Sequence, residues 1–111
     1  MADALPEARH RRRAWLTLRY VPEPNQMPSK ADLEVFQRIE DELTAKLEED
    51  RLGDLVAVVT LAGKRDHLIY FSEEEQVVKT VAAVMRPFAK YRPEVEISDD
   101  PNWDELRNMM G

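Results

Sequence analysis

Two apolar segments lie close together near the middle of the chain. They are residues 54–62 (DLVAVVTLA) and 67–71 (HLIYF), and the short polar sequence GKRD separates them. Runs of β-branched, aliphatic and aromatic residues of this length are typical of strands. Gly63, at the start of the polar sequence, indicates a turn, so the two strands are expected to form a β-hairpin. The rest of the chain must then supply the elements that cover this hairpin.

Helical periodicity precedes the hairpin. Ser29 and Asp32 have the spacing of a capping box, which marks the start of a helix. Apolar residues then recur every three or four positions, as they do on one face of a helix. These residues are Leu33, Phe36, Ile39, Leu43 and Leu47. Gly53 is expected to stop the helix, because glycine readily takes the left-handed conformation found beyond helix ends.

A second helical pattern follows the hairpin. Ser72 is expected to start it, with Glu75 at the reciprocal capping position. Its apolar face is Val77, Val81, Val84, Met85 and Phe88. Pro87 lacks a backbone donor, so the helix is expected to kink or end near Arg86.

Two further strands complete the pattern. Residues 14–21 (AWLTLRYV) alternate between apolar and polar positions, and residues 94–98 (EVEIS) do the same. The order strand, helix, strand, strand, helix, strand is that of the ferredoxin-like split βαβ fold (βαββαβ). We therefore expect an α+β, two-layer sandwich with a four-stranded antiparallel sheet. Residues 1–13 lack periodicity and are expected to be a mobile N-terminal arm, with a single domain over residues 14–111.

Composition and charge exclude several classes of protein. The 111 residues include no cysteine, so disulfides, thiolate zinc sites and cysteine nucleophiles are excluded. The longest apolar run, residues 55–62, is too short to span a membrane. The net charge is −6: residues 1–20 carry +3 and the remainder −9. An acidic body disfavours nucleic acid and favours protein partners. These features are typical of a cytoplasmic protein.

The C-terminal sequence SDDPNWDELRNMMG, residues 98–111, has two readings. Asp99 and Asp100 could form an acid–base or metal site, but adjacent side chains do not normally aim at one point. An aspartate before a proline is favourable at the start of a helix. We therefore expect Asp100 and Pro101 to open a short C-terminal helix, with Trp103 anchoring the end of the chain.

Several of these residues also resemble a known family. The hairpin contains a Gly-x-Arg-x-x-x-x-Tyr sequence and the chain ends in an Asp-Pro-x-Trp sequence. The matching residues are Gly63, Arg65, Tyr70, Asp100, Pro101 and Trp103. The chain therefore resembles a bacterial family catalogued as domain of unknown function 695, over about residues 14–107. The resemblance implies a ferredoxin-like fold. It supplies no reaction and hence no catalytic residues.

The sheet face without helices is the main candidate for a site. In this fold the first strand is central, so Trp15, Thr17 and Arg19 would point outward. Glu94 and Glu96 would lie beside them. The hairpin would complete the face with one of two alternating sets, which the sequence leaves open. These sets are His67, Ile69 and Phe71, or Leu68 and Tyr70. An exposed apolar face needs a cover, which could be a partner subunit, the N-terminal arm or the C-terminal segment.

Two hypotheses about function follow. The first is a non-catalytic domain that acts through protein contact on the open sheet face, as a homodimer or with a regulatory partner. The second is a small-ligand or enzymatic domain that uses Arg19, His67, Tyr70 and Glu96. His67 is expected to be a surface residue near the hairpin turn, without a partner nearby in sequence for acid–base work. Nothing in the sequence calls for a metal or cofactor.

Overall fold

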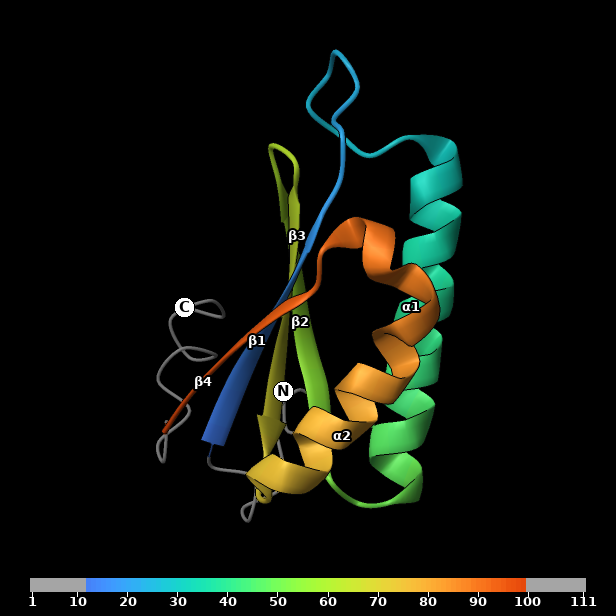
Figure 1. Ribbon diagram of the computed structural model, residues 1–111. Coiled ribbons are helices and arrows are strands. Elements are labelled where there is room, and N and C mark those ends of the chain that lie inside the picture. The colour runs from blue at the N-terminus through green and yellow to red at the C-terminus, as the bar shows by residue number, and fades with distance from the viewer. Residues whose placement is uncertain (1–11, 100–111) are drawn as a thin grey trace.

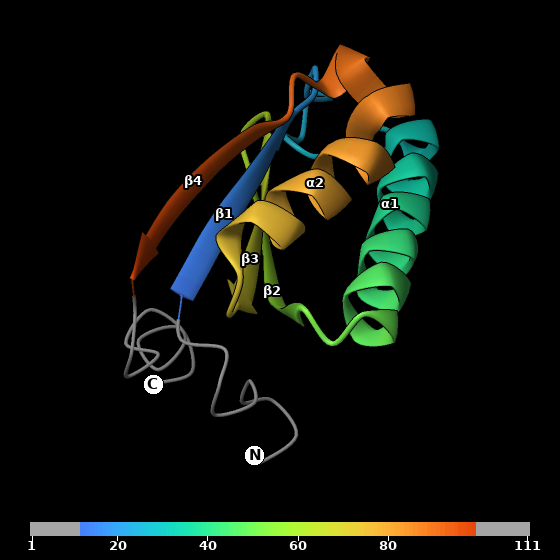
Figure 2. The same ribbon diagram turned by 60° about the horizontal axis from the view of Figure 1, so that its bottom comes forward.

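Two helices cover one face of a four-stranded antiparallel sheet, and the other face has no helix of the described chain on it (Figures 1 and 2). This arrangement is seen in a computed structural model, which describes residues 12–99. The elements are, in order, β1 (Arg12–Arg19), α1 (Lys30–Glu49), β2 (Gly53–Leu61), β3 (Lys64–Phe71), α2 (Glu74–Met85), the 3-10 helix η2 (Arg86–Tyr91) and β4 (Glu94–Asp99). The chain is thus α+β with an open antiparallel sheet.

The order of strands across the sheet is β2-β3-β1-β4, so β1 and β3 are central and β2 and β4 form the edges. β1 begins at Arg12, where the sequence analysis placed the mobile arm, and it ends at Arg19. Arg12 and Arg13 have ladder partners on both neighbouring strands, which explains the earlier start. Residues 1–11 and 100–111, including Asp100, Pro101, Trp103 and the expected C-terminal helix, lie outside the described residues.

Helix α1 begins as its sequence predicts. Ser29 is the N-cap, and its hydroxyl accepts a hydrogen bond from the Asp32 amide at 3.1 Å. The carboxylate of Asp32 does not complete the capping box in the expected way, because it accepts a hydrogen bond from the Tyr91 hydroxyl at 2.7 Å. The expected stop at Gly53 was wrong. The left-handed residue after the helix is Arg51, with φ of 51°, and Gly53 instead opens β2.

Helix α2 starts at Glu74, after Glu73 as N-cap, and no side chain caps it. The expected cap at Ser72 was therefore wrong, while Glu74 and Glu75 in the first turn favourably face the positive end of the helix dipole. The α-helix ends at Met85 and continues as η2 with Pro87 in its first turn, as the proline requires.

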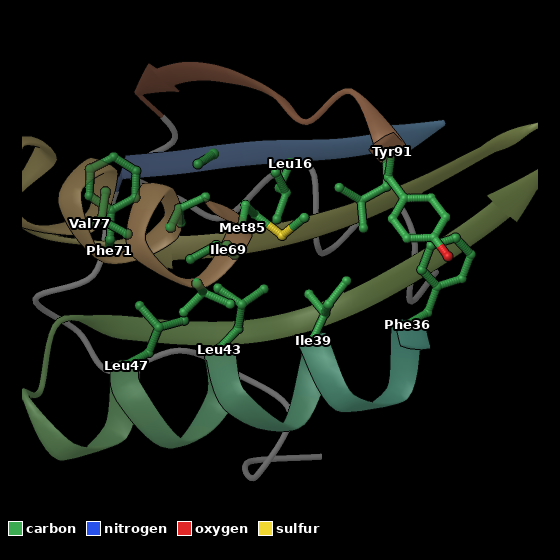
Figure 3. Packing of buried hydrophobic residues seen from close by; sticks show 14 of the residues in the cluster. Leu16, Phe36, Ile39, Leu43, Leu47, Ile69, Phe71, Val77, Met85 and Tyr91 are labelled. Atoms are coloured by element: carbon green, nitrogen blue, oxygen red, sulfur yellow. The ribbon is translucent and has the colours of Figure 1, made fainter. Parts of the chain in front are cut away.

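The core lies between the sheet and the two helices (Figure 3). β1 contributes its even-numbered side chains, β3 its odd-numbered apolar ones, and each helix contributes one face. The large apolar residues of this core with no more than 2% exposure are Leu16, Leu18, Phe36, Ile39, Leu43, Leu47, Ile69 and Phe71. Leu33, expected on the buried face of α1, is 37% exposed. Ile97 of β4 packs against the core, whereas Val95, two residues earlier on the same side of the strand, is 41% exposed.

The β2–β3 hairpin turns at Ala62 and Gly63, which both have positive φ, of 44° and 91°. Two positive φ values in a two-residue loop are typical of the turn that best matches the twist of paired strands. The register therefore places Leu61 opposite Lys64. A bulge at Val56 shifts this register by one residue further along β2.

Candidate functional site

The open face of the sheet carries the outward side chains of β1. Leu16 and Leu18 point into the core, so the alternation of the strand directs Trp15, Thr17 and Arg19 to the other face. All three were predicted to lie there. Antiparallel pairing places Glu96 of β4 opposite Trp15, Glu94 opposite Thr17, and Asp66 of β3 on the other side of Thr17.

These side chains line a shallow hollow of about 370 Å³ on the open face. Its residues are Trp15, Thr17, Arg19, Lys64, Asp66, Glu94 and Glu96. Two internal contacts fix its floor. The Thr17 hydroxyl donates to Oδ1 of Asp66 at 2.6 Å, and Nε of Arg19 donates to Oε1 of Glu94 at 3.1 Å. The floor of the hollow is therefore a set of cross-strand polar pairs, which hold their side chains in place.

Glu96 differs from the other carboxylates of the hollow. Asp66 and Glu94 each have a polar partner, but Glu96 is exposed and forms no ion pair within residues 12–99. It lies directly across from the half-buried Trp15 in the ladder. The hollow thus has, beside an indole, a carboxylate with no ion-pair partner among residues 12–99, and this combination suits a positively charged group.

The apolar half of the open face is already buried. Leu68 and Tyr70 of β3 are both 0% exposed, although α1 and α2 lie on the opposite side of the sheet. The described residues that pack against them, Trp15, Val56 and Ala57, belong to the sheet itself. Tyr70 is consequently not available to a ligand.

His67 does not lie on the open face, and its expected position at the surface was wrong. It pairs with Leu16 in the register, and both side chains point under α1. The ring is 0% exposed. Its Nε2 atom lies 2.7 Å from Oε2 of Glu40 on α1, and its Nδ1 atom lies 3.1 Å from the carbonyl oxygen of Leu16. His67 is thus part of the core.

Arg65 extends this buried polar cluster. Its Nε and Nη2 atoms donate to the two oxygens of Glu40 at 2.7 and 3.0 Å, and its Nη1 atom donates to the Thr60 hydroxyl at 2.7 Å. The side chains of Glu40 and Arg65 are about 15% exposed. Such a two-point contact fixes both side chains. We call Glu40, Thr60, Arg65 and His67 the buried polar cluster.

The cluster strongly favours the ionised form of Glu40. Burial by itself raises the pKa of this carboxyl, but the hydrogen bonds from His67 and Arg65 together outweigh burial and lower the pKa to about 2, from 4.5. Both ring nitrogens of His67 lie within hydrogen-bond distance of an oxygen atom, one of Glu40 and one of Leu16. The cluster therefore joins α1 to β3 through these contacts and the ion pair of Arg65 with Glu40. With His67 inaccessible, it has no place for a substrate.

Sequence reasoning missed Glu40, which is the centre of this cluster. A signal exists: Glu40 follows Phe36 by four residues and precedes Leu43 by three, which places it beside the apolar face of its helix. Within residues 12–99 there is no group of three or more histidine, aspartate or glutamate side chains arranged to hold a metal ion. The described helices include none long and apolar enough to cross a membrane.

The comparison with protein families supports the resemblance drawn from the sequence. A family model, described as a family of unknown function (DUF695), matches residues 2–109. The chain belongs to the DUF695 family. Comparisons with curated proteins and with solved structures found no match. Membership therefore assigns no reaction or ligand to this DUF695 chain, and its surfaces must be read from their chemistry.

A second hollow of this DUF695 chain, of about 550 Å³, lies beyond the end of β1. It is lined by Arg19, Tyr20, Val21, Asp32, Lys90, Tyr91 and Arg92. Asp32 accepts a hydrogen bond from the Tyr91 hydroxyl, and Arg19 forms an ion pair with Glu94. Lys90 and Arg92 are exposed and form no ion pair with any described residue. This hollow is therefore locally basic in an acidic protein.

Proposed function

We propose that this DUF695 domain binds another protein through the hollow on the open sheet face and carries out no chemistry of its own. The observation that supports the proposal is the pairing of Trp15 with Glu96. An indole and an unpaired carboxylate together recognise a lysine or arginine side chain, because the ring attracts the cation and the carboxylate forms an ion pair with it. We infer that one basic side chain of the partner enters the hollow.

The surroundings of Trp15 support this role. The indole is half-buried, and Leu68 and Tyr70 pack beside it, so it loses little freedom on binding. Tryptophans held in this way frequently dominate the energy of protein contacts. The pairs Thr17–Asp66 and Arg19–Glu94 keep the rest of the floor in place.

Charge favours a basic partner. The chain has a net charge of −6, and the basic residues within its first twenty positions leave the remainder more acidic still. Such a field attracts a basic surface and accelerates its association at low ionic strength. The partner is accordingly a protein with a basic contact surface, consistent with the regulatory complex that the sequence suggested.

A matched pair of charge reversals tests this function. The tagged full chain, its Glu96→Lys variant and its Glu34→Lys variant are recovered from cells that naturally make the protein, and bound proteins are quantified by mass spectrometry. Glu34 is exposed on α1, so its reversal changes net charge equally. We expect that a basic protein is bound to the wild type and to Glu34→Lys, and that it is not bound to Glu96→Lys. Identical bound proteins for all three would contradict the proposal.

We also propose that the fold is of the ferredoxin-like class and that the protein works in a bacterial cytoplasm. The element order and the strand order β2-β3-β1-β4 support the fold class. The family resemblance supports a bacterial source, and the lack of cysteine agrees with a reducing compartment.

The second candidate function is a small-ligand domain. The residues first considered for it do not converge, because His67 lies under α1 and Tyr70 is buried. The basic hollow favours it instead, because Lys90 and Arg92 suit a small anion. Thermal unfolding with inorganic phosphate, sulfate and citrate tests it. An anion site predicts that the anions raise the unfolding temperature of the wild type and of Lys79→Glu but not that of Arg92→Glu. Equal shifts for the wild type and both variants would exclude such a site.

A further inference from the structure

The free edge of β2 is the most exposed apolar part of the described sheet. Val58 and Val59 are each 38% exposed and Leu61 is 72% exposed. From Leu55 to Leu61 the strand has no charged residue and no proline. Edge strands that remain single usually carry such residues, because an unprotected edge pairs readily with another strand. The bulge at Val56 protects one end of β2, but residues 57–61 form a regular ladder with β3.

The opposite edge of the sheet, β4, is protected against pairing with another strand. β4 follows Pro93 and carries Glu94, Glu96 and Asp99. A second β4 paired antiparallel about its centre would place Glu94 of each chain opposite Asp99 of the other, and like charges facing each other cost energy. The two edges of one sheet therefore differ: β4 repels a copy of itself, and β2 does not.

The hairpin geometry identifies which backbone groups of β2 face outward. In a two-residue hairpin the residues beside the turn, Leu61 and Lys64, exchange both of their backbone hydrogen bonds. Pairs then alternate, so Val58 and Thr60 direct their N–H and C=O groups away from β3. These groups are the ones that a further strand would bind.

We propose that the partner of this edge is β2 of a second copy of the chain, paired antiparallel with Val59 at the two-fold axis. Val58 then faces Thr60 of the second copy, and the two residues exchange their free backbone groups. Repetition by symmetry gives about four hydrogen bonds between the copies. The result is one continuous sheet across the dimer.

The side chains of β2 are self-complementary in this register. On the open-face side Val59 meets the second Val59, and the large Leu61 meets the small Ala57 of the other copy. On the helix side Val58 meets Thr60. No charged side chain faces another, which is why a second copy is a suitable occupant. This surface is separate from the Trp15 hollow, so the dimer does not depend on the proposed function.

The net charge sets the salt dependence of the dimer. Each copy carries −6, so two copies repel each other at a distance. The contact itself is apolar and hydrogen-bonded, which salt does not weaken. Raising sodium chloride from about 50 to about 500 mM screens the repulsion and should tighten association. An interface held by ion pairs would respond in the opposite direction.

Three exposed valines provide a matched test. Val59 lies on the β2 edge, Val78 on α2 and Val95 on the β4 edge, with exposures of 38%, 41% and 41%. Sedimentation equilibrium from about 5 to about 500 µM covers the range of a small interface. We expect a wild-type dimer that Val59→Lys weakens at least tenfold, while Val78→Lys and Val95→Lys leave it unchanged. Far-UV circular dichroism checks that each variant is folded.

Mixing opposite charges tests that the partner is a second copy in this register. Val59→Lys and Val59→Glu should each be monomeric alone and should form a mixed dimer when combined, because position 59 then faces its opposite charge. Since the chain has no cysteine, Val59→Cys should also give a disulfide-linked dimer with a mild oxidant, and Val95→Cys should not.

The outcomes that overturn this inference are clear. A wild type that is monomeric at every concentration excludes it. A dimer that Val95→Lys dissociates, or that Val59→Lys leaves intact, places the contact elsewhere. Neither result bears on binding at Trp15 and Glu96, which the Glu96→Lys comparison decides separately.

Discussion

Nε2 of the fully buried His67 lies 2.7 Å from Oε2 of Glu40, and this contact joins the central strand β3 to helix α1. Arg65 binds the same carboxylate from the other side. Replacing a buried ionic cluster with apolar residues is often neutral, but removing one member leaves the others without a partner and is costly. The cluster therefore fixes how α1 sits on β3, and single substitutions expose its contribution.

Acid should weaken the fold through Glu40. The pKa of this carboxyl is about 2 in the folded chain and 4.5 ordinarily, so its contribution is present above pH 4.5 and is lost as the pH falls toward 2. The contribution is up to roughly 3 kcal/mol. Glu40→Gln should lower the free energy of unfolding at pH 6. At pH 3 the variant and the wild type should differ less in this free energy, which urea unfolding measures at both pH values. Parallel pH curves for the two proteins would refute this, and Glu34→Gln serves as the control.

His67 and Glu40 should be energetically coupled. His67→Phe removes both ring hydrogen bonds and leaves the Leu16 carbonyl without that donor, which should cost about 2 kcal/mol. In a double-mutant cycle with Glu40→Gln, the coupling energy should be at least about 1 kcal/mol. The cycle is measured by urea unfolding at pH 7. Additive effects of the two substitutions would show that the contact carries no energy of its own.

The elements of the fold were predictable where local physics determines them. The periodicity from Phe36 to Leu47, the cap at Ser29 and the turn at Gly63 all led to the observed elements. The helix ends were less predictable. Arg51 takes the left-handed position that glycine was expected to fill, and Gly53 instead lies where the chain passes close to Tyr70.

The site was predictable only in part. The alternation of β1 correctly placed Trp15, Thr17 and Arg19 on the open face. The side of β3 that faces outward could not be read from HLIYF, because both alternating sets of this segment are mostly apolar. The partner that turns His67 inward is Glu40, and 27 residues separate the two in sequence. Only the three-dimensional pairing brings them together.

Alkaline pH should weaken the fold through Tyr91. Burial, followed by the hydrogen bond to Asp32, raises the pKa of its hydroxyl to about 12 from 10. The unfolded chain then loses this proton first, so stability falls as the pH rises from about 10 to about 12. Tyr91→Phe should remove this dependence and cost about 1 kcal/mol at neutral pH. Urea unfolding at pH 8 and pH 11 checks both effects, and an unchanged alkaline slope would count against the assignment.

Gly53 should tolerate no side chain. A Cβ atom there would collide with the Tyr70 carbonyl oxygen and lie 3.1 Å from Cβ of Phe71. Gly53→Ala should therefore destabilise the fold by about 2 to 3 kcal/mol. Gly63→Ala, at a turn with φ of 91° and more space, should cost about 1 kcal/mol. Thermal unfolding compares the two, and equal effects would contradict the close approach of β2 and β3.

The central claim, that the hollow around Trp15 is a protein contact, is tested most directly by a photo-crosslinking residue at Thr17. Thr17 lies on the floor of the hollow, and Gln37, exposed on α1, provides the control position. In cells that make the protein, we predict that position 17 yields one defined covalent product with a basic protein, that position 37 does not, and that Glu96→Lys abolishes the product. The same products from both positions, or a product that Glu96→Lys leaves intact, would contradict the claim.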